Sequence, residues 1–312
     1  MNIYLPIADL SINLFLVIGI GALVGFLSGI FGVGGGFLLT PIMMMIGIPP
    51  PVAAASDSNQ IVASSASGAF GHWRLGNVDM KMGLIVLAGG VSGGTVGVQV
   101  VYYLRQLGNF EFAMKLLYVL VLGLVGGAMF LESLNTIRKS RKQDDTGAMP
   151  EMSEPKLSKF FAKLPLQMNF TKSQIKVSAI FPFAIGFAVG FLAAMLGVGG
   201  GFIMVPAMIY IIGMPTITAI GTDLFQIVLT SANVTFMQAM TNHTVDVMLA
   251  LSLLIGSTLG AQFGVRASKL FRGEQIRILL STLVLGMMIK LLLDLVVEPD
   301  NVISFAKGVV GH

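Results

Sequence analysis

The chain has 312 residues, of which 55% are hydrophobic and 11% charged, and its mean hydropathy is +0.86. This composition lies far outside that of soluble domains and indicates an integral membrane protein. The absence of cysteine excludes disulfides, thiolate metal sites and thiol redox chemistry. The formal net charge of +4 is better explained by basic loops on one side of a membrane than by nucleic-acid binding, so the expected partner is a lipid bilayer and not nucleic acid.

Apolar segments recur along the whole chain with lengths that predict an all-α membrane bundle rather than an outer-membrane barrel. In the first half they cover 12–31, 37–46, 52–70, 82–104 and 112–131. A polar stretch follows, and the second half repeats the order at 177–196, 202–212, 216–239, 247–270 and 276–297. The first segment lacks a basic region before it, so we interpret it as a retained helix and not as a signal peptide.

A glycine-rich motif occurs twice: residues 25–41 read GFLSGIFGVGGGFLLTP, and residues 190–206 read GFLAAMLGVGGGFIMVP. The similarity continues beyond the motif at offsets of 165 to 167 residues, with the matched pairs Asp57 and Asp223, Gln60 and Gln226, and Asp79 and Asp246. An internal duplication of this kind predicts two halves with one fold. The expected organisation is a first transmembrane repeat (1–132), a basic cytoplasmic linker (133–176), a second repeat (177–298) and an external tail (299–312).

The basic residues indicate how the two halves are oriented. With five segments per half and a cytoplasmic central loop, only Arg105, Lys115 and Lys307 fall outside. A rival count treats 37–46 and 202–212 as re-entrant, which gives four spans per half and moves the basic cluster 266–277 outside. We therefore predict about ten transmembrane helices, arranged as two inverted five-helix repeats with short broken helices and with both termini external.

The segments after the glycine motifs have only about ten residues, or about 15 Å of helix, whereas the hydrocarbon core is about 30 Å thick. The glycine breaks should therefore lie inside the membrane, where a helix starting at Phe37 or Phe202 would direct unpaired N–H groups at an anion. The predicted substrate-binding residues are Gly34, Gly35, Gly36, Phe37, Asn59, Gln60, Gly199, Gly200, Gly201, Phe202 and Gln226. For the glycines at four-residue spacing, Gly25 with Gly29 and Gly186 with Gly190, close helix packing is the simpler explanation.

Asp57 and Asp223 are acids at matching positions inside apolar segments, where a carboxyl group is costly and usually functional. We expect them to couple the cycle to protons or cations, or to orient the glycine loops; capping of a helix start is the structural alternative. Gln60 and Gln226 would supply neutral donors, or else hydrogen bonds between helices. Asn59 is matched by Phe225 in the second half, so the site should be asymmetric.

The doubled GxxGVGGGFxxxP motif, each copy followed by a Gly-[Ile/Met]-Pro turn and a segment with a Ser/Thr-Asp pair, resembles the sulfite exporter (TauE/SafE) family. The resemblance covers most of the chain outside the central loop. It implies export of a small sulfur-containing anion, such as sulfite, sulfoacetate or a related organosulfonate, through the bacterial inner membrane. Only the glycine motifs carry over residue by residue; the roles of the polar residues are inferred from their positions.

Together these features predict a multi-pass secondary transporter that works by alternating access, with proton coupling as an open alternative. A passive anion channel is the first rival. A membrane-embedded enzyme is less well supported, because the sequence has no cluster of histidines or thiols. We expect no catalytic residues, no metal and no cofactor, and the sequence leaves homodimerisation open.

Overall fold

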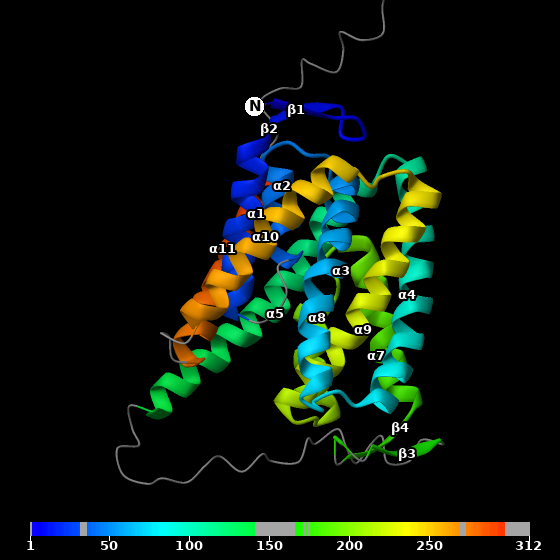
Figure 1. Ribbon diagram of the computed structural model, residues 1–312, viewed down its shortest axis with the longest axis vertical. Coiled ribbons are helices and arrows are strands. Elements are labelled where there is room, and N and C mark those ends of the chain that lie inside the picture. Colours follow the sequence, from blue (N-terminus) through cyan, green and yellow to red (C-terminus); the bar gives the residue numbers. More distant parts are fainter. Residues whose placement is uncertain are drawn as a thin grey trace, which may run out of the picture.

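The computed structural model describes residues 2–31, 36–140, 166–170, 172–173, 175–268 and 273–296. It is a mostly helical bundle with a short β-hairpin at each end of its long axis (Figure 1). The first hairpin pairs β1 (Asn2–Leu5) with β2 (Leu10–Asn13). The second pairs β3 (Gln167–Phe170) with β4 (Ile175–Ser178).

The helices follow the order of the predicted segments. In the first half they are α1 (Leu14–Phe31), α2 (Gly36–Met45), α3 (Pro50–Arg74), α4 (Met80–Gln106) and α5 (Phe110–Ser140). In the second half they are α7 (Ile180–Leu196), α8 (Gly201–Pro206) with the π-helical turn η1 (Ala207–Ile212), α9 (Thr216–Met237) with η2 (Gln238–Asn242), α10 (Val247–Ser268) and α11 (Gly273–Val296).

Helices long and apolar enough to cross a bilayer are present in the described residues at Met80–Gln106, Phe110–Ala128, Thr216–Asn242, Val247–Gly264 and Ile278–Val296. Shorter apolar helices cover Leu14–Ser28, Gly36–Met45, Ile180–Leu196 and Gly201–Ile212. The prediction of a mostly helical, multi-pass membrane protein is therefore confirmed, while the count of ten spans stays a prediction. The two hairpins were not predicted, because strands of four residues carry too little periodicity to be recognised.

Each hairpin is held by an aspartate of the opposite half. The Ile7 amide of the first hairpin donates to Asp246 Oδ2 at 3.1 Å. In the turn of the second, Ser173 donates to Asp79 Oδ2 from its amide at 3.1 Å and from its hydroxyl at 2.6 Å. The other carboxylate oxygen of each aspartate accepts an amide in the first turn of α10 or α4. The matched pair Asp79 and Asp246 thus joins the halves at opposite ends of the bundle (Figure 1).

Helices of different halves form the closest pairs. α1 packs against α10 and α4 against α7, while α3 and α9 pack on each other and also contact α10 and α4. Glycines allow this proximity: a Cβ built on Gly25 would lie 2.2 Å from the Ser257 carbonyl oxygen, and one on Gly190 would lie 2.2 Å from that of Gly90. Close packing is therefore the established role of these two glycines.

This packing predicts that Gly25→Val lowers stability far more than Gly19→Val on the same helix. A Cβ at residue 25 meets backbone atoms of Ser257, which cannot move aside, whereas nothing lies within 4 Å of a Cβ at Gly19. The expected cost at residue 25 is about 1–3 kcal/mol. Thermal unfolding of the two variants in detergent measures the difference, and equal melting temperatures would contradict the described α1–α10 contact.

Candidate functional site

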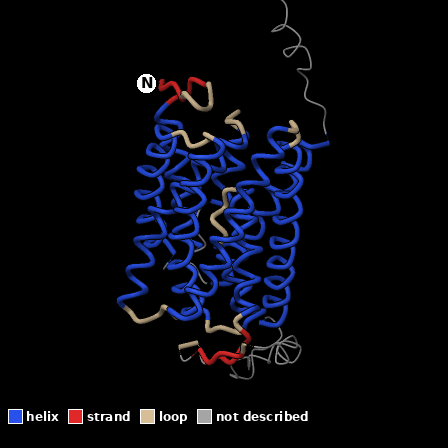
Figure 2. The backbone as a smooth tube through the Cα atoms, turned by 90° about the vertical axis from the view of Figure 1, so that its right-hand side faces the viewer, coloured by secondary structure: helices blue, strands red, loops and turns tan. Residues whose placement is uncertain are grey.

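The break of the second repeat lies between α7 and α8 and is built from glycines in left-handed conformations. Gly197, Gly199 and Gly200 have φ angles of +73°, +69° and +89°, which residues with a Cβ adopt only at a cost. Figure 2 shows tan loop among the helices, away from both ends of the bundle. The predicted helix break is therefore present, and the new helix starts at Gly201, one residue before the predicted start.

The first break is described only at its edges. α1 ends at Phe31 and α2 starts at Gly36, while the predicted binding residues Gly34 and Gly35 lie outside the described residues. The α2 start agrees with the predicted start at Phe37 to within one residue. The two short helices therefore begin at corresponding positions of the repeat.

The starts of these two helices meet inside the bundle. The rings of Phe37 and Phe202 are stacked, with centroids 4.7 Å apart and an interplanar angle of 16°. Both side chains are buried, at 0% and 1% exposure. A Cβ built on Gly36 would lie 2.9 Å from the Val198 carbonyl oxygen, so the backbone of α2 also touches the second break.

Two isoleucines at matching positions of the repeat pack against the glycine loop of the second break. Ile61 of α3 and Ile227 of α9 are separated by 166 residues, the offset that also relates Asp57 to Asp223. A Cβ built on Gly199 would lie 2.8 Å from Ile61 and 3.2 Å from Ile227, and both side chains are buried. The glycine loop is therefore covered at Gly199 by one apolar side chain from each half.

Asp57 is fully buried on α3 and forms a hydrogen bond to the first short helix. Thr40 Oγ1 of α2 donates to Asp57 Oδ2 at 2.7 Å. Among the described residues, the second carboxyl oxygen of Asp57 has no hydrogen-bond partner. The bond joins α3 to the first short helix, while the role of Asp57 stays a prediction.

Asp223 has a different environment, although the repeat places it at the matching position. Gln226 Nε2 donates to Asp223 Oδ1 at 2.9 Å, and Thr230 Oγ1 donates to Gln226 Oε1 at 2.9 Å. All three lie on one face of α9, and Thr230 approaches Gly90 of α4. The position that matches Thr40 is Val205, which has no hydroxyl, so Asp223 bonds along its own helix.

The remaining predicted polar residues also differ between the halves. Gln60 Nε2 donates to Ser257 Oγ of α10 at 2.6 Å, and its side-chain oxygen has no partner among the described residues. Asn59 is half-buried beside it on α3. Phe225, which replaces Asn59 in the second half, packs edge-on against Trp73 with centroids 6.1 Å apart. The contacts of these matched polar positions therefore differ between the two halves, while the asymmetry of a binding site stays a prediction.

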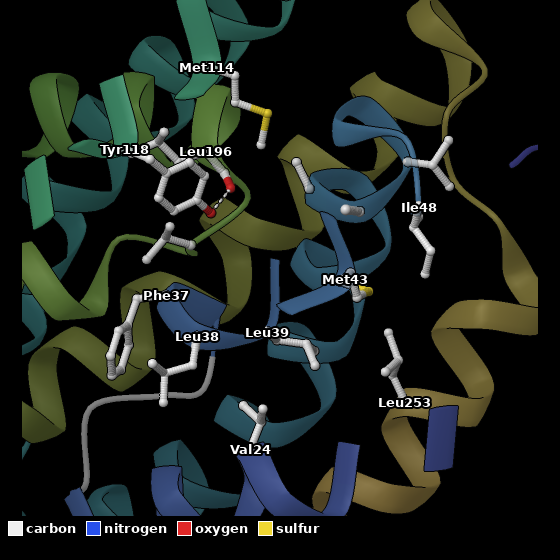
Figure 3. Packing of buried hydrophobic residues seen from close by; sticks show 14 of the residues in the cluster. Val24, Phe37, Leu38, Leu39, Met43, Ile48, Met114, Tyr118, Leu196 and Leu253 are labelled. Atoms are coloured by element: carbon white, nitrogen blue, oxygen red, sulfur yellow. Dashed lines mark hydrogen bonds between the residues drawn. The ribbon is translucent and has the colours of Figure 1, made fainter. Parts of the chain in front are cut away.

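Sequence reasoning missed Thr40 and Tyr118. Tyr118 of α5 is fully buried, and its hydroxyl donates to the carbonyl of Leu196, the last residue of α7 (Figure 3). Two signals were available in the sequence: Tyr118 is the only tyrosine in its apolar segment, and Thr40 is the one hydroxyl residue between the glycines and the proline of the first motif. Within the described residues, no group of three or more His, Cys, Asp or Glu side chains could hold a metal ion.

Comparison with known proteins identifies relatives of this chain. Residues 17–291 match the model of a family described as Sulfite exporter TauE/SafE. The probable membrane transporter protein YunE of Bacillus subtilis (strain 168) is 25% identical over 264 residues, which cover 80% of this chain and 86% of YunE. YjnA of the same organism, with the same description, is 26% identical over 282 residues, covering 88% and 98%. No solved structure matches significantly.

The geometry predicts that cysteines at residues 37 and 202 can be cross-linked. The natural chain contains no cysteine, so Phe37→Cys with Phe202→Cys would provide the two thiols of the protein. With a protease site inserted in the central loop, a short bifunctional thiol reagent should keep the cleaved halves together on a denaturing gel, because the two rings stack.

The matched control pairs Phe37→Cys with Phe236→Cys, since Phe236 is 62% exposed on α9. Separation of the halves is expected for this control. Equal yields of linked halves from both pairs, or none from the first, would contradict the described meeting of the two helix starts.

Proposed function

Because the chain belongs to the sulfite exporter TauE/SafE family of membrane transporters, we propose that it exports a small sulfur-containing anion, such as sulfite, sulfoacetate or a related organosulfonate. The transport step would be alternating access across a bacterial inner membrane. The single observation that carries the proposal is the buried meeting of the two helix starts at Phe37 and Phe202.

The proposed anion site consists of backbone amides at the starts of α2 and α8. Together with η1, α8 forms one apolar helix over Gly201–Ile212. At α8 the first backbone bonds run from Ile203 and Met204 to the Gly200 carbonyl, at 3.0 and 2.8 Å. The amides of Gly201 and Phe202 precede these bonds, and within the described residues no acceptor is paired with them. Amides at a helix start carry partial positive charge and suit an anion that has left its hydration shell.

Access to this site would require the apolar cover to move. Phe37 stacks on Phe202, and Ile61 and Ile227 lie on the glycine loop, so the described conformation corresponds to a closed site in the proposed cycle. Gln60 and Gln226, whose amides are engaged by Ser257 and Asp223, would turn toward the anion when the cover opens. Asn59 would add a donor in the first half.

Inverted repeats would give such a site two alternating routes. The proposal is supported by the hairpins at opposite ends and by the reciprocal contacts of Asp79 and Asp246 (Figure 1). The central loop would be cytoplasmic, because it joins the hairpin end where Lys172 donates to the Gly76 carbonyl, near Arg74 and Lys81. Asp57 and Asp223 would couple transport to protons, since neither forms an ion pair among the described residues.

A carrier of this kind predicts counterflow. Proteoliposomes loaded with unlabelled sulfite and diluted into labelled sulfite should transiently accumulate label above its equilibrium level. The reason is that each carrier that moves an unlabelled anion out of the vesicle returns with a labelled anion. A passive channel would let the label equilibrate without an overshoot. The absence of an overshoot, together with a flux that does not saturate, would favour the channel.

The proposed amide site also predicts that Gly200→Ala lowers anion flux by about tenfold, by adding a methyl group and left-handed strain at the break. Gly47→Ala is the matched control: its φ of +93° resembles the +89° of Gly200, but nothing lies within 4 Å of its Cβ. Flux per inserted protein, measured in proteoliposomes, should stay near wild type in the control. Equal flux in both variants would refute the site.

A further inference from the structure

Tyr118 connects the first repeat to the helix end that precedes the second glycine break. Its hydroxyl donates to the Leu196 carbonyl, one of the terminal carbonyls that a helix leaves without an internal partner (Figure 3). The Gly197 amide is already used by the Ala193 carbonyl at 2.8 Å. Tyr118 therefore holds the last carbonyl of α7 at the point where the backbone turns into the loop.

The same tyrosine lies beside Thr40, whose hydroxyl donates to Asp57 Oδ2 at 2.7 Å. The three side chains come from α5, α2 and α3, and each is 0% exposed. Polar side chains thus lie one beside the next from Asp57 through Thr40 and Tyr118 to the end of α7, with hydrogen bonds at both ends of the line. These side chains connect the acid of the first half to the glycine loop of the second half.

The direction of hydrogen bonds along this line depends on the charge of Asp57, because each hydroxyl has one proton to donate. An ionised Asp57 only accepts, so Thr40 donates to it, and the hydroxyl of Tyr118 donates to the Leu196 carbonyl. A protonated Asp57 can donate to Thr40, which then donates to Tyr118. This added bond polarises the hydroxyl of Tyr118 and strengthens its own hydrogen bond to the Leu196 carbonyl.

We propose that Thr40 and Tyr118 are positioning residues that transmit the protonation state of Asp57 to the glycine loop at Gly197–Gly200. The inference deepens the proposed function and rests on its assignment of coupling to Asp57. A proton enters only at Asp57; the hydroxyl proton of Thr40 stays on its oxygen and changes its acceptor from Asp57 to Tyr118, while that of Tyr118 stays with Leu196. Proton uptake tightens the hold on the end of α7, and proton release loosens it.

The second half has no equivalent line, since Val205 replaces Thr40 and Asp223 bonds to Gln226. The two matched acids therefore have different tasks. Within the described residues, no Lys or Arg forms an ion pair with Asp57 from any helix packed against α3, and Tyr118 is the titratable side chain that interacts with it. The charge of Asp57 is thus free to change without breaking an ion pair.

Hydrogen exchange tests the proposal on the purified full chain, without requiring a substrate. Amide exchange in a peptide covering residues 197–202, corrected for the intrinsic effect of pH, should slow by about tenfold from about pH 8 to about pH 6 in wild type, as expected for gaining one buried hydrogen bond. Tyr118→Phe and Thr40→Val should abolish this response, since both remove a hydroxyl with little change of volume. Thr40→Ser should retain it.

Asp57→Asn should also abolish the response, whereas Asp223→Asn should leave it intact. In proteoliposomes the Asp57→Asn, Thr40→Val and Tyr118→Phe variants should flatten the pH dependence of flux of labelled sulfoacetate, a probe whose charge is constant over this range.

If Asp57→Asn loses the response while Tyr118→Phe and Thr40→Val keep it, the relay is wrong and coupling through Asp57 stands. If Asp57→Asn keeps the wild-type response, both the relay and the proposed coupling fail. A retained exchange response without any anion flux would refute the proposed function and leave the relay supported.

Discussion

A helix that is interrupted inside a membrane leaves backbone amides and carbonyls where water cannot satisfy them, and this constraint organises the bundle. The carbonyl of Leu196 is satisfied by Tyr118 from the other half. The glycine loop after it is enclosed by Ile61 and Ile227, and the start of α8 is set against the start of α2 by the phenylalanine stack. α3, α5 and α9 each supply one side chain, Ile61, Tyr118 and Ile227, that covers or holds the second break. Amides left without an acceptor in this shelter are the groups that a negatively charged solute would use.

The duplication preserves the backbone and changes its side-chain chemistry. Asp57 and Asp223 occupy matched positions, but one bonds across to a short helix and the other bonds along its own. The difference follows from one residue pair, Thr40 and Val205. Such divergence lets the two halves keep one arrangement of helices while their matched acids form different hydrogen bonds.

Much of this fold was accessible from the sequence, because apolar runs and paired glycine motifs act locally. They predicted the helical segments, the interruptions after α1 and α7, and two acids inside apolar segments, both of which are buried. The contacts that complete the site join residues far apart: 78 positions separate Tyr118 from Leu196, and 197 separate Gln60 from Ser257. Hydropathy does not specify which helices become neighbours, so these pairs were not predicted. Asp79 and Asp246 were recognised as a matched pair, but their bonds to the hairpins depend on the docking of the two halves.

The pairing of α1 with α10 and of α4 with α7 has a consequence for biogenesis. Ser257 is synthesised 232 positions after its neighbour Gly25, and Gly190 is synthesised 100 positions after Gly90. While the ribosome is still translating the second half, the small-residue faces of α1 and α4 must rest against lipid or against the insertion machinery. The nascent first half therefore cannot reach its final packing alone, and a chain truncated after α5 would present these faces to quality-control proteases.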